Sequence, residues 1–320
     1  MATTKRQLSA RTDRMRAALG AFSCEQTTPN PTLSDRLAAQ FGRSLIPVLI
    51  EYGLTSEDPR IREGSVWTLY HKFDCPAAAQ AGIRKLIEDP HPKVRWYAVW
   101  AYEKYGPKGI DALRALIRRL KDPDISVRSH ALRTIGRIGP KASRAVEPII
   151  ACIAASRSKR GSNAHLHWSI CSEGAKTLGL LRAKPQKSVE MLRKLLTHRY
   201  EYARTAAMEA LAEFGSSALP ALDDMVKVLK QNDRYQYSAG NNIAALGKKA
   251  FPRLLDSLSE VSDLASTIRG LQTFGVERSA RAILERVRND GNISAELASR
   301  SLIALGPEAV QVAIELSCSI

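Results

Sequence analysis

A glycine followed five residues later by a proline recurs along this 320-residue chain and limits its possible folds more than any other feature. The spacing occurs in QFGRSLIPVL at 40–49, in EFGSSALPAL at 213–222 and in LGKKAFPRLL at 246–255. Glycine just past an apolar helix provides a left-handed C-cap, and proline suits the first helical turn because its missing N–H needs no partner there. Each occurrence therefore predicts two helices joined by a short turn.

This turn position returns at intervals of about 28 to 40 residues, which is the period of a repeat protein. The helix before each turn, as in VRSHALRTIGRIG at 127–139, has apolar residues at three-and-four spacing, and Asp-Pro precedes it in DPHPKVR and DPDISVR. The pattern predicts an all-α fold of about nine stacked hairpins over residues 32–320, after a basic tail or irregular segment at 1–31. The turns are expected at Gly42, Asp74, Gly106, Gly139, Gly179, Gly215, Gly247, Gly275 and Gly306.

Composition agrees with a helical protein of a reducing compartment. Aromatic residues make up only 6% of the chain, which is few for a β-sandwich. The five cysteines are odd in number and include no CxxC pair, so a disulfide framework is not indicated and a cytoplasmic location is expected. No apolar run approaches the ~20 residues of a membrane span, so no membrane partner is expected.

The repeated units resemble the HEAT-repeat family, particularly its short bacterial form related to phycobilisome lyase repeats. The resemblance covers residues 32–316, is strongest at 89–158, and weakens after 260, where SDLASTIRGLQTFG lacks the Val-Arg pair. It implies a right-handed α-α superhelix, a HEAT-like α-solenoid. Since this family includes adaptors, transport receptors, lyases, hydroxylases and DNA glycosylases, the fold leaves the function open.

Residues that could support catalysis or hold a metal are not arranged for either. The iron-binding hydroxylases of similar repeats need His-Glu pairs, and no His-Glu dipeptide occurs here. His165 and His167 would diverge on a helix, and Cys171 falls on a core position of its repeat. Neither a nucleophile elbow nor a glycine-rich phosphate loop is present. We therefore predict no catalytic residue, metal or cofactor, although an enzyme is not excluded.

Positive charge is concentrated in the middle of the chain. Between Gly106 and Arg199 there are 20 Lys and Arg against 6 Asp and Glu, a net +14 out of +16 for the chain. The second helices of two hairpins turn cations outward, and the insertion SRSKRGSNA at 156–164 adds three more. A localised excess of this size predicts a partner-binding surface. Its predicted cations are Arg114, Arg118, Arg119, Arg157, Lys159, Arg160, Arg193 and Lys194.

Two tryptophans could take part in such a surface. Trp96 and Trp100 are four residues apart, at positions where the next repeat has Ser129 and Arg133, so both should lie on an outward or flanking stripe. They could stack on bases, or they could be covered by the preceding hairpin or by the N-terminal segment. We favour cover, because large aromatic side chains usually fill packing space.

These features favour a non-catalytic scaffold or adaptor that binds an acidic protein partner through a basic central surface. Nucleic-acid binding, as in a DNA repair factor, is the alternative, since phosphates would be attracted to the same cations. A lyase-like enzyme or a chaperone for a prosthetic group is a weaker alternative that the resemblance leaves open. The oligomeric state is not predicted.

Overall fold

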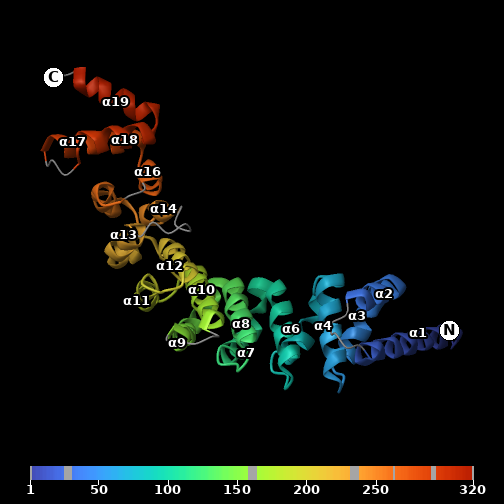
Figure 1. Cartoon of the computed structure of the whole chain (residues 1–320). Helices are drawn as coiled ribbons and strands as arrows, with labels where there is room; N and C mark the ends of the chain where they lie inside the picture. The colour runs from blue at the N-terminus through green and yellow to red at the C-terminus, as the bar shows by residue number, and fades with distance from the viewer. Residues whose placement is uncertain are drawn as a thin grey trace. The chain divides into compact units, whose positions relative to one another are not determined.

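A computed structural model describes residues 2–24, 31–157, 164–230, 238–261, 264–289 and 293–318. Every regular element in these ranges is helical (Figure 1). The chain divides into two compact units, Met1–Pro148 and Ile149–Ile320, and the boundary falls inside α9 (Val146–Arg157).

The first unit begins with α1 (Ala2–Leu19) and continues as helices in consecutive pairs. The first helices of successive pairs pack on one another, α2 on α4, α4 on α6 and α6 on α8, so they form one layer. The pairs are α2 (Pro31–Phe41) with α3 (Leu45–Val48), α4 (Pro59–Phe73) with α5 (Gln80–Leu86), α6 (Pro92–Tyr102) with α7 (Leu113–Arg119), and α8 (Ile125–Ile138) with α9.

The second unit continues the same pattern, with α10 packed on α12, α12 on α14, α14 on α16 and α16 on α18. Over the described ranges, the whole chain has nine helix pairs in sequence order, which confirms the predicted all-α, HEAT-like array of hairpins. The later pairs are α10 (Ala164–Leu181) with α11 (Pro185–Leu195), α12 (Glu201–Glu213) with α13 (Leu222–Lys230), α14 (Ala239–Ala244) with α15 (Phe251–Asp256), α16 (Leu264–Gln272) with α17 (Val276–Asn289), and α18 (Ala295–Leu305) with α19 (Pro307–Cys318).

Eight of the nine predicted turn residues have positive φ, and seven of these are glycines. The exception is Gly179, which lies inside α10, while Arg182 and Lys184 make the turn with φ of 47° and 48°. A Cβ on Gly179 would lie 2.9 Å from the Cα of Ala210 in α12. This glycine therefore permits the close approach of two helices, and the prediction of a turn there is wrong.

The N-terminal segment differs from the basic tail or irregular segment predicted for residues 1–31. Residues 2–19 form α1, and Met15, Leu19 and Phe22 are buried. Phe22 packs on Gly64 of α4, and the guanidinium of Arg16 lies 3.8 Å from the ring centre of Tyr52. The short apolar patch before residue 24 thus covers the first hairpins, because its side chains bury more readily than they solvate.

Arginine–aspartate pairs join successive hairpins of the first unit. Arg62 of α4 donates two hydrogen bonds to Asp89 at 2.7 and 2.9 Å, and Arg95 of α6 donates two to Asp122 at 2.8 and 2.9 Å. The Arg95–Asp122 side chains are 8% and 0% exposed. Arg62 and Arg95 occupy the same repeat position, which we call the repeat arginine, and their two pairs form a ladder between successive hairpins.

The next two repeat arginines, Arg128 and Arg204, also contact the backbone. Arg128 donates to the backbone carbonyl oxygen of Asp122 at 2.5 Å, and Arg204 donates to that of His198 at 2.7 Å. These arginines therefore tie down the loop before their own helix.

We predict that Asp122→Ala destabilises the first unit by about 3–5 kcal/mol, because a buried guanidinium loses its counter-charge. The matched control is Glu88→Ala, which breaks the exposed pair with Arg118 and should cost about 1 kcal/mol or less. Urea unfolding followed by circular dichroism measures both. Equal losses in the two variants would contradict a special role for the buried ladder.

Candidate partner-binding surface

The cations predicted on α7 are largely compensated. The Nε of Arg118 lies 2.6 Å from Glu88 of the preceding hairpin, and Arg119 lies 3.0 Å from Asp122. Arg114 is exposed and makes no ion pair with the described part of the chain. Only one of these three predicted residues therefore offers an uncompensated charge.

In the second unit the predicted cations show the same compensation. Arg193 lies 2.8 Å from Asp224, and Lys194 lies 2.7 Å from Glu190. Arg157 is exposed at the end of α9, whereas Lys159 and Arg160 lie outside the described residues. A single basic surface that joins the cations of both units stays a prediction.

The first-helix layer of the first unit offers a better-defined site. The fifth residue after the repeat arginine is Trp67 in α4, Trp100 in α6 and Arg133 in α8. Residues four apart on a helix share one face, so the ninth position continues each stripe. Because the three helices pack side by side, the stripes form one surface, which we call the aromatic–cationic face. It comprises Trp67, Tyr70, His71, Trp96, Trp100, Lys104, His130, Arg133 and Arg137.

Trp100 is at the centre of the aromatic part of this face. Its ring centre lies 4.3 Å from that of Tyr70 and 5.9 Å from that of Trp67, both from α4. It also lies 5.7 Å from Trp96, with the planes 19° apart, and 6.4 Å from His130 of α8. The preceding hairpin therefore packs against Trp100, as expected, yet Trp96 and Trp100 are only half-buried.

A hollow of about 680 Å³ opens beside Trp100. Within it Lys104 lies 2.8 Å from Asp74, and Arg137 lies 3.1 Å from Glu103. Arg137 keeps 65% of its side chain exposed, so its charge remains accessible from solvent. The hollow is lined by Tyr70, Trp100, Glu103, Lys104, Gly106, Pro107, Arg133 and Arg137.

Burial favours the neutral form of the two histidines of the face. Burial, assisted by nearby Arg133, lowers the pKa of His130 to about 4. Burial also lowers the pKa of His71, with Lys72 and Lys104 acting in the same direction. The positive charge of the aromatic–cationic face therefore comes from its lysine and arginines.

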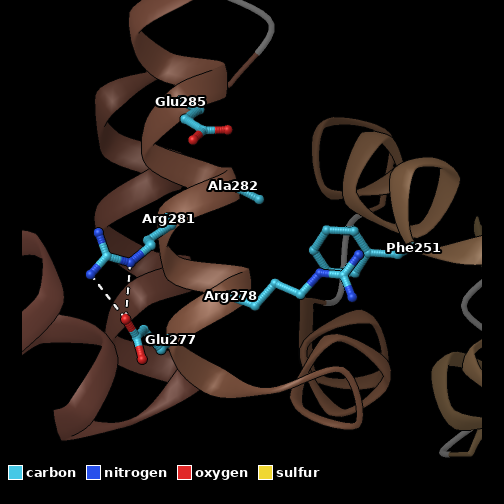
Figure 2. A pocket seen from close by; sticks show the side chains of 6 residues that line it. All are labelled: Phe251, Glu277, Arg278, Arg281, Ala282 and Glu285. Carbon is cyan, nitrogen blue, oxygen red and sulfur yellow. Dashed lines mark hydrogen bonds and ion pairs between the residues drawn. The ribbon is translucent and has the colours of Figure 1, made fainter. Parts of the chain in front are cut away.

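A second hollow, of about 490 Å³, lies between α15 and α17 in the second unit (Figure 2). Arg278 reaches across it to within 4.4 Å of the Phe251 ring centre, and Arg281 lies 2.9 Å from Glu277. Both arginines already have partners within the hollow, so it offers less to a ligand than the aromatic–cationic face does.

The sequence analysis named Trp96 and Trp100 as candidates but did not name the cations beside them. The signal was present, because Arg133 and Arg137 occupy the fifth and ninth positions after the repeat arginine of α8. The net charge of the central segment led instead to a predicted binding surface on the second helices of the hairpins. Aligning the first helices on their arginines would have placed tryptophan and arginine in one row.

The structure adds two observations on other kinds of site. Among the described residues, no three His, Cys, Asp or Glu side chains gather closely enough to hold a metal ion. None of the described helices has the length and hydropathy needed to cross a membrane.

Comparisons with known proteins support a repeat protein at the level of the fold. The family model for HEAT repeats matches residues 80–166, so this part of the chain is similar to HEAT repeats. A comparison with curated protein sequences finds no match.

Solved structures agree with the class at the level of the fold. An engineered protein is 16% identical, with a TM-score of 0.54 over 96% of this chain and 88% of its own. Kap121p is 13% identical, with a TM-score of 0.57 over 94% of this chain and 42% of its own. A structure from a study of cadherin and β-catenin is 13% identical, with a TM-score of 0.52 over 83% of this chain and 59% of its own.

Acid should destabilise the first unit through His130. Its folded-state pKa lies below the unfolded value of 6.5, so the unfolded chain binds the proton more readily. The stability that the neutral ring contributes is complete above pH 6.5 and is lost as the pH falls toward about 4. We expect the free energy of unfolding to fall by about 2 kcal/mol. This is less than the full pKa shift of His130 would give, because the ring is partly exposed to solvent.

The check is urea unfolding at several pH values for the wild-type protein and His130→Gln. Between pH 7 and pH 4, the free energy of unfolding should fall by about 2 kcal/mol less in the variant than in the wild-type protein. Parallel pH profiles would show that His130 does not carry this dependence.

Proposed function

We propose that this protein is a non-catalytic repeat scaffold that binds an acidic protein partner through the aromatic–cationic face of its first unit. The observation that carries the proposal is the hollow in which Tyr70 and Trp100 lie beside Lys104, Arg133 and Arg137. Tryptophan, tyrosine and arginine are the residues that most often dominate the energy of protein interfaces.

The sign of the charge favours an acidic partner. Arg133 and Arg137 belong to the segment of net charge +14, and both are exposed. The pair between Arg137 and Glu103 is solvent-exposed on the arginine side, and such pairs contribute little stability. A carboxylate from a partner could therefore bind Arg137 in the two-pronged geometry that guanidinium groups favour.

The same contacts favour a protein over a nucleic acid. Glu103 lines the hollow and Asp74 lies 2.8 Å from Lys104, so a continuous phosphate backbone would meet two carboxylates. A protein segment can place its acidic groups selectively and avoid both carboxylates.

The fold is compatible with this role but does not define it. One of the similar structures comes from work on the interaction between cadherin and β-catenin, which is an interaction between proteins. Stacked repeats present side chains from successive units at regular intervals, which suits recognition of a partner along several hairpins.

The test is a selection of random peptides displayed on phage, with the full chain as target. We expect Asp and Glu to be enriched and the selected peptides to lose at least tenfold in affinity for Arg133→Glu/Arg137→Glu. The matched control is Arg114→Glu/Lys121→Glu, which makes the same charge change on exposed residues at α7 and should bind within about twofold of wild type.

A labelled single-stranded oligonucleotide, titrated at two salt concentrations, covers the alternative. Tighter binding of the oligonucleotide than of any peptide, with a steep salt dependence and loss in Arg133→Glu/Arg137→Glu, would replace the proposal with nucleic-acid binding. Equal effects of the two double variants on peptide binding would remove the aromatic–cationic face from the proposal.

A further inference from the structure

We infer that the partner segment binds in an extended conformation and places an apolar or aromatic side chain in the hollow at Trp100, about three residues from acidic side chains that meet Arg133 and Arg137. This inference rests on the proposed function, because it specifies the ligand of the same face.

The chemistry changes across the face from one helix to the next. The rings of Trp67 and Tyr70 from α4 meet Trp100 from α6, so this part is predominantly aromatic. The corresponding positions of α8 are Arg133 and Arg137. A segment that crosses the helices therefore meets an aromatic region first and a cationic region next, or the reverse.

The aromatic end of the hollow suits a carboxylate less well than the end at Arg133 and Arg137, because its own cation, Lys104, is already paired with Asp74 at 2.8 Å. Glu103 lines the hollow with only 15% of its side chain exposed, and burial favours the neutral form of the neighbouring histidine of α4, His71. An acidic side chain placed there would face this carboxylate without a free counter-charge from α4. An apolar side chain would instead cover Trp100 and Tyr70, and a volume of about 680 Å³ accommodates the largest side chains.

The spacing follows from the geometry of packed helices. Trp100 and Arg133 have the same repeat position on α6 and α8, which pack side by side. Packed helices are about 8–10 Å apart, and an extended chain advances about 3.3 Å per residue, so about three residues separate the two contacts. A helical ligand advances only about 1.5 Å per residue and would need about six.

The position of the two arginines adds a second constraint. Arg133 and Arg137 are one turn apart along α8, about 6 Å, so they can meet two acidic side chains of the partner. Adjacent residues of an extended chain point to opposite sides, whereas residues two apart share a side and lie about 6.6 Å apart. A segment that crosses from α6 and then bends to follow α8 would therefore meet both arginines with an acidic pair that has one residue between its members.

The experiment uses fluorescein-labelled synthetic peptides of Gly and Ser that carry Glu-Ser-Glu and a single Phe. The Phe is placed about one, three or six residues from the nearer Glu, on either side, and anisotropy reports binding to the full chain. We expect the peptide with Phe three residues from the nearer Glu to bind at least fivefold more tightly than the other peptides. This advantage should appear only when Phe lies on one of the two sides of Glu-Ser-Glu. A peptide without Phe should bind as weakly as the peptide in which Phe lies one residue from the nearer Glu.

Variants of the protein separate the contacts. Trp100→Ala should abolish the advantage of the Phe peptide, and Trp100→Phe, which keeps an aromatic ring, should retain most of it. Leu180→Ala removes an exposed apolar side chain of α10 and should change nothing. Circular dichroism of each variant shows whether α6 remains folded.

The outcomes distinguish the inference from the proposed function. If no acidic peptide binds the wild-type chain, the proposed function itself fails. If acidic peptides bind but the Phe, its spacing and Trp100 make no difference, the proposed function stands and the inference is overturned. An optimum at the six-residue spacing would also overturn it, since the ligand would then be helical.

Discussion

The buried pairing of arginine with aspartate between neighbouring hairpins is the interaction on which the rest of the first unit depends. Asp122 accepts two hydrogen bonds from Arg95 and also accepts one from the backbone N–H of Asp124 at 3.0 Å. One carboxylate therefore fixes both the loop before α8 and the position of α6 beside it. Asp89 serves Arg62 and the N–H of His91 in the same way.

Because these pairs repeat, they also set the register of the outer face. When the arginine of each first helix occupies an equivalent place, residues five positions later lie side by side. Trp67, Trp100 and Arg133 are brought together in this way although about 33 residues separate each from the next. The aromatic–cationic face is thus a consequence of the ladder, and its chemistry depends on which residues occupy the repeated positions.

The second unit shows what happens where the ladder changes its chemistry. Trp168 stands in the place of the repeat arginine, and His198 stands in the place of the aspartate. The Nδ1 of His198 still accepts the backbone N–H of Tyr200 at 3.1 Å, so the loop contact survives, while the ion pair is replaced by a ring contact at 6.4 Å. Burial and nearby Arg157 lower the pKa of His198, which keeps the ring neutral.

Local patterns predicted the hairpins and most of the turns, because each depends on a few residues close in sequence or on the repeat itself. Gly179 was misassigned because a glycine that lets two helices approach looks the same in sequence as a glycine in a turn. The burial of Phe22 could not be predicted either, since it depends on contact with Gly64, which is 42 residues away. Tertiary contacts of this kind have no local signature.

The central excess of cations shows why net charge alone is a poor guide to a binding surface. Summing over residues 106–199 counts Arg118 and Arg193 fully, although each meets a carboxylate of a neighbouring hairpin that lies outside that segment, Glu88 or Asp224. Exposed ion pairs between repeats compensate charge without adding much stability. What distinguishes Arg133 and Arg137 is their position beside half-buried aromatic rings, where a partner gains apolar contact and charge pairing together. A binding surface is therefore identified by which side chains the repeats align, and the charge of the segment only sets the sign of the partner it attracts.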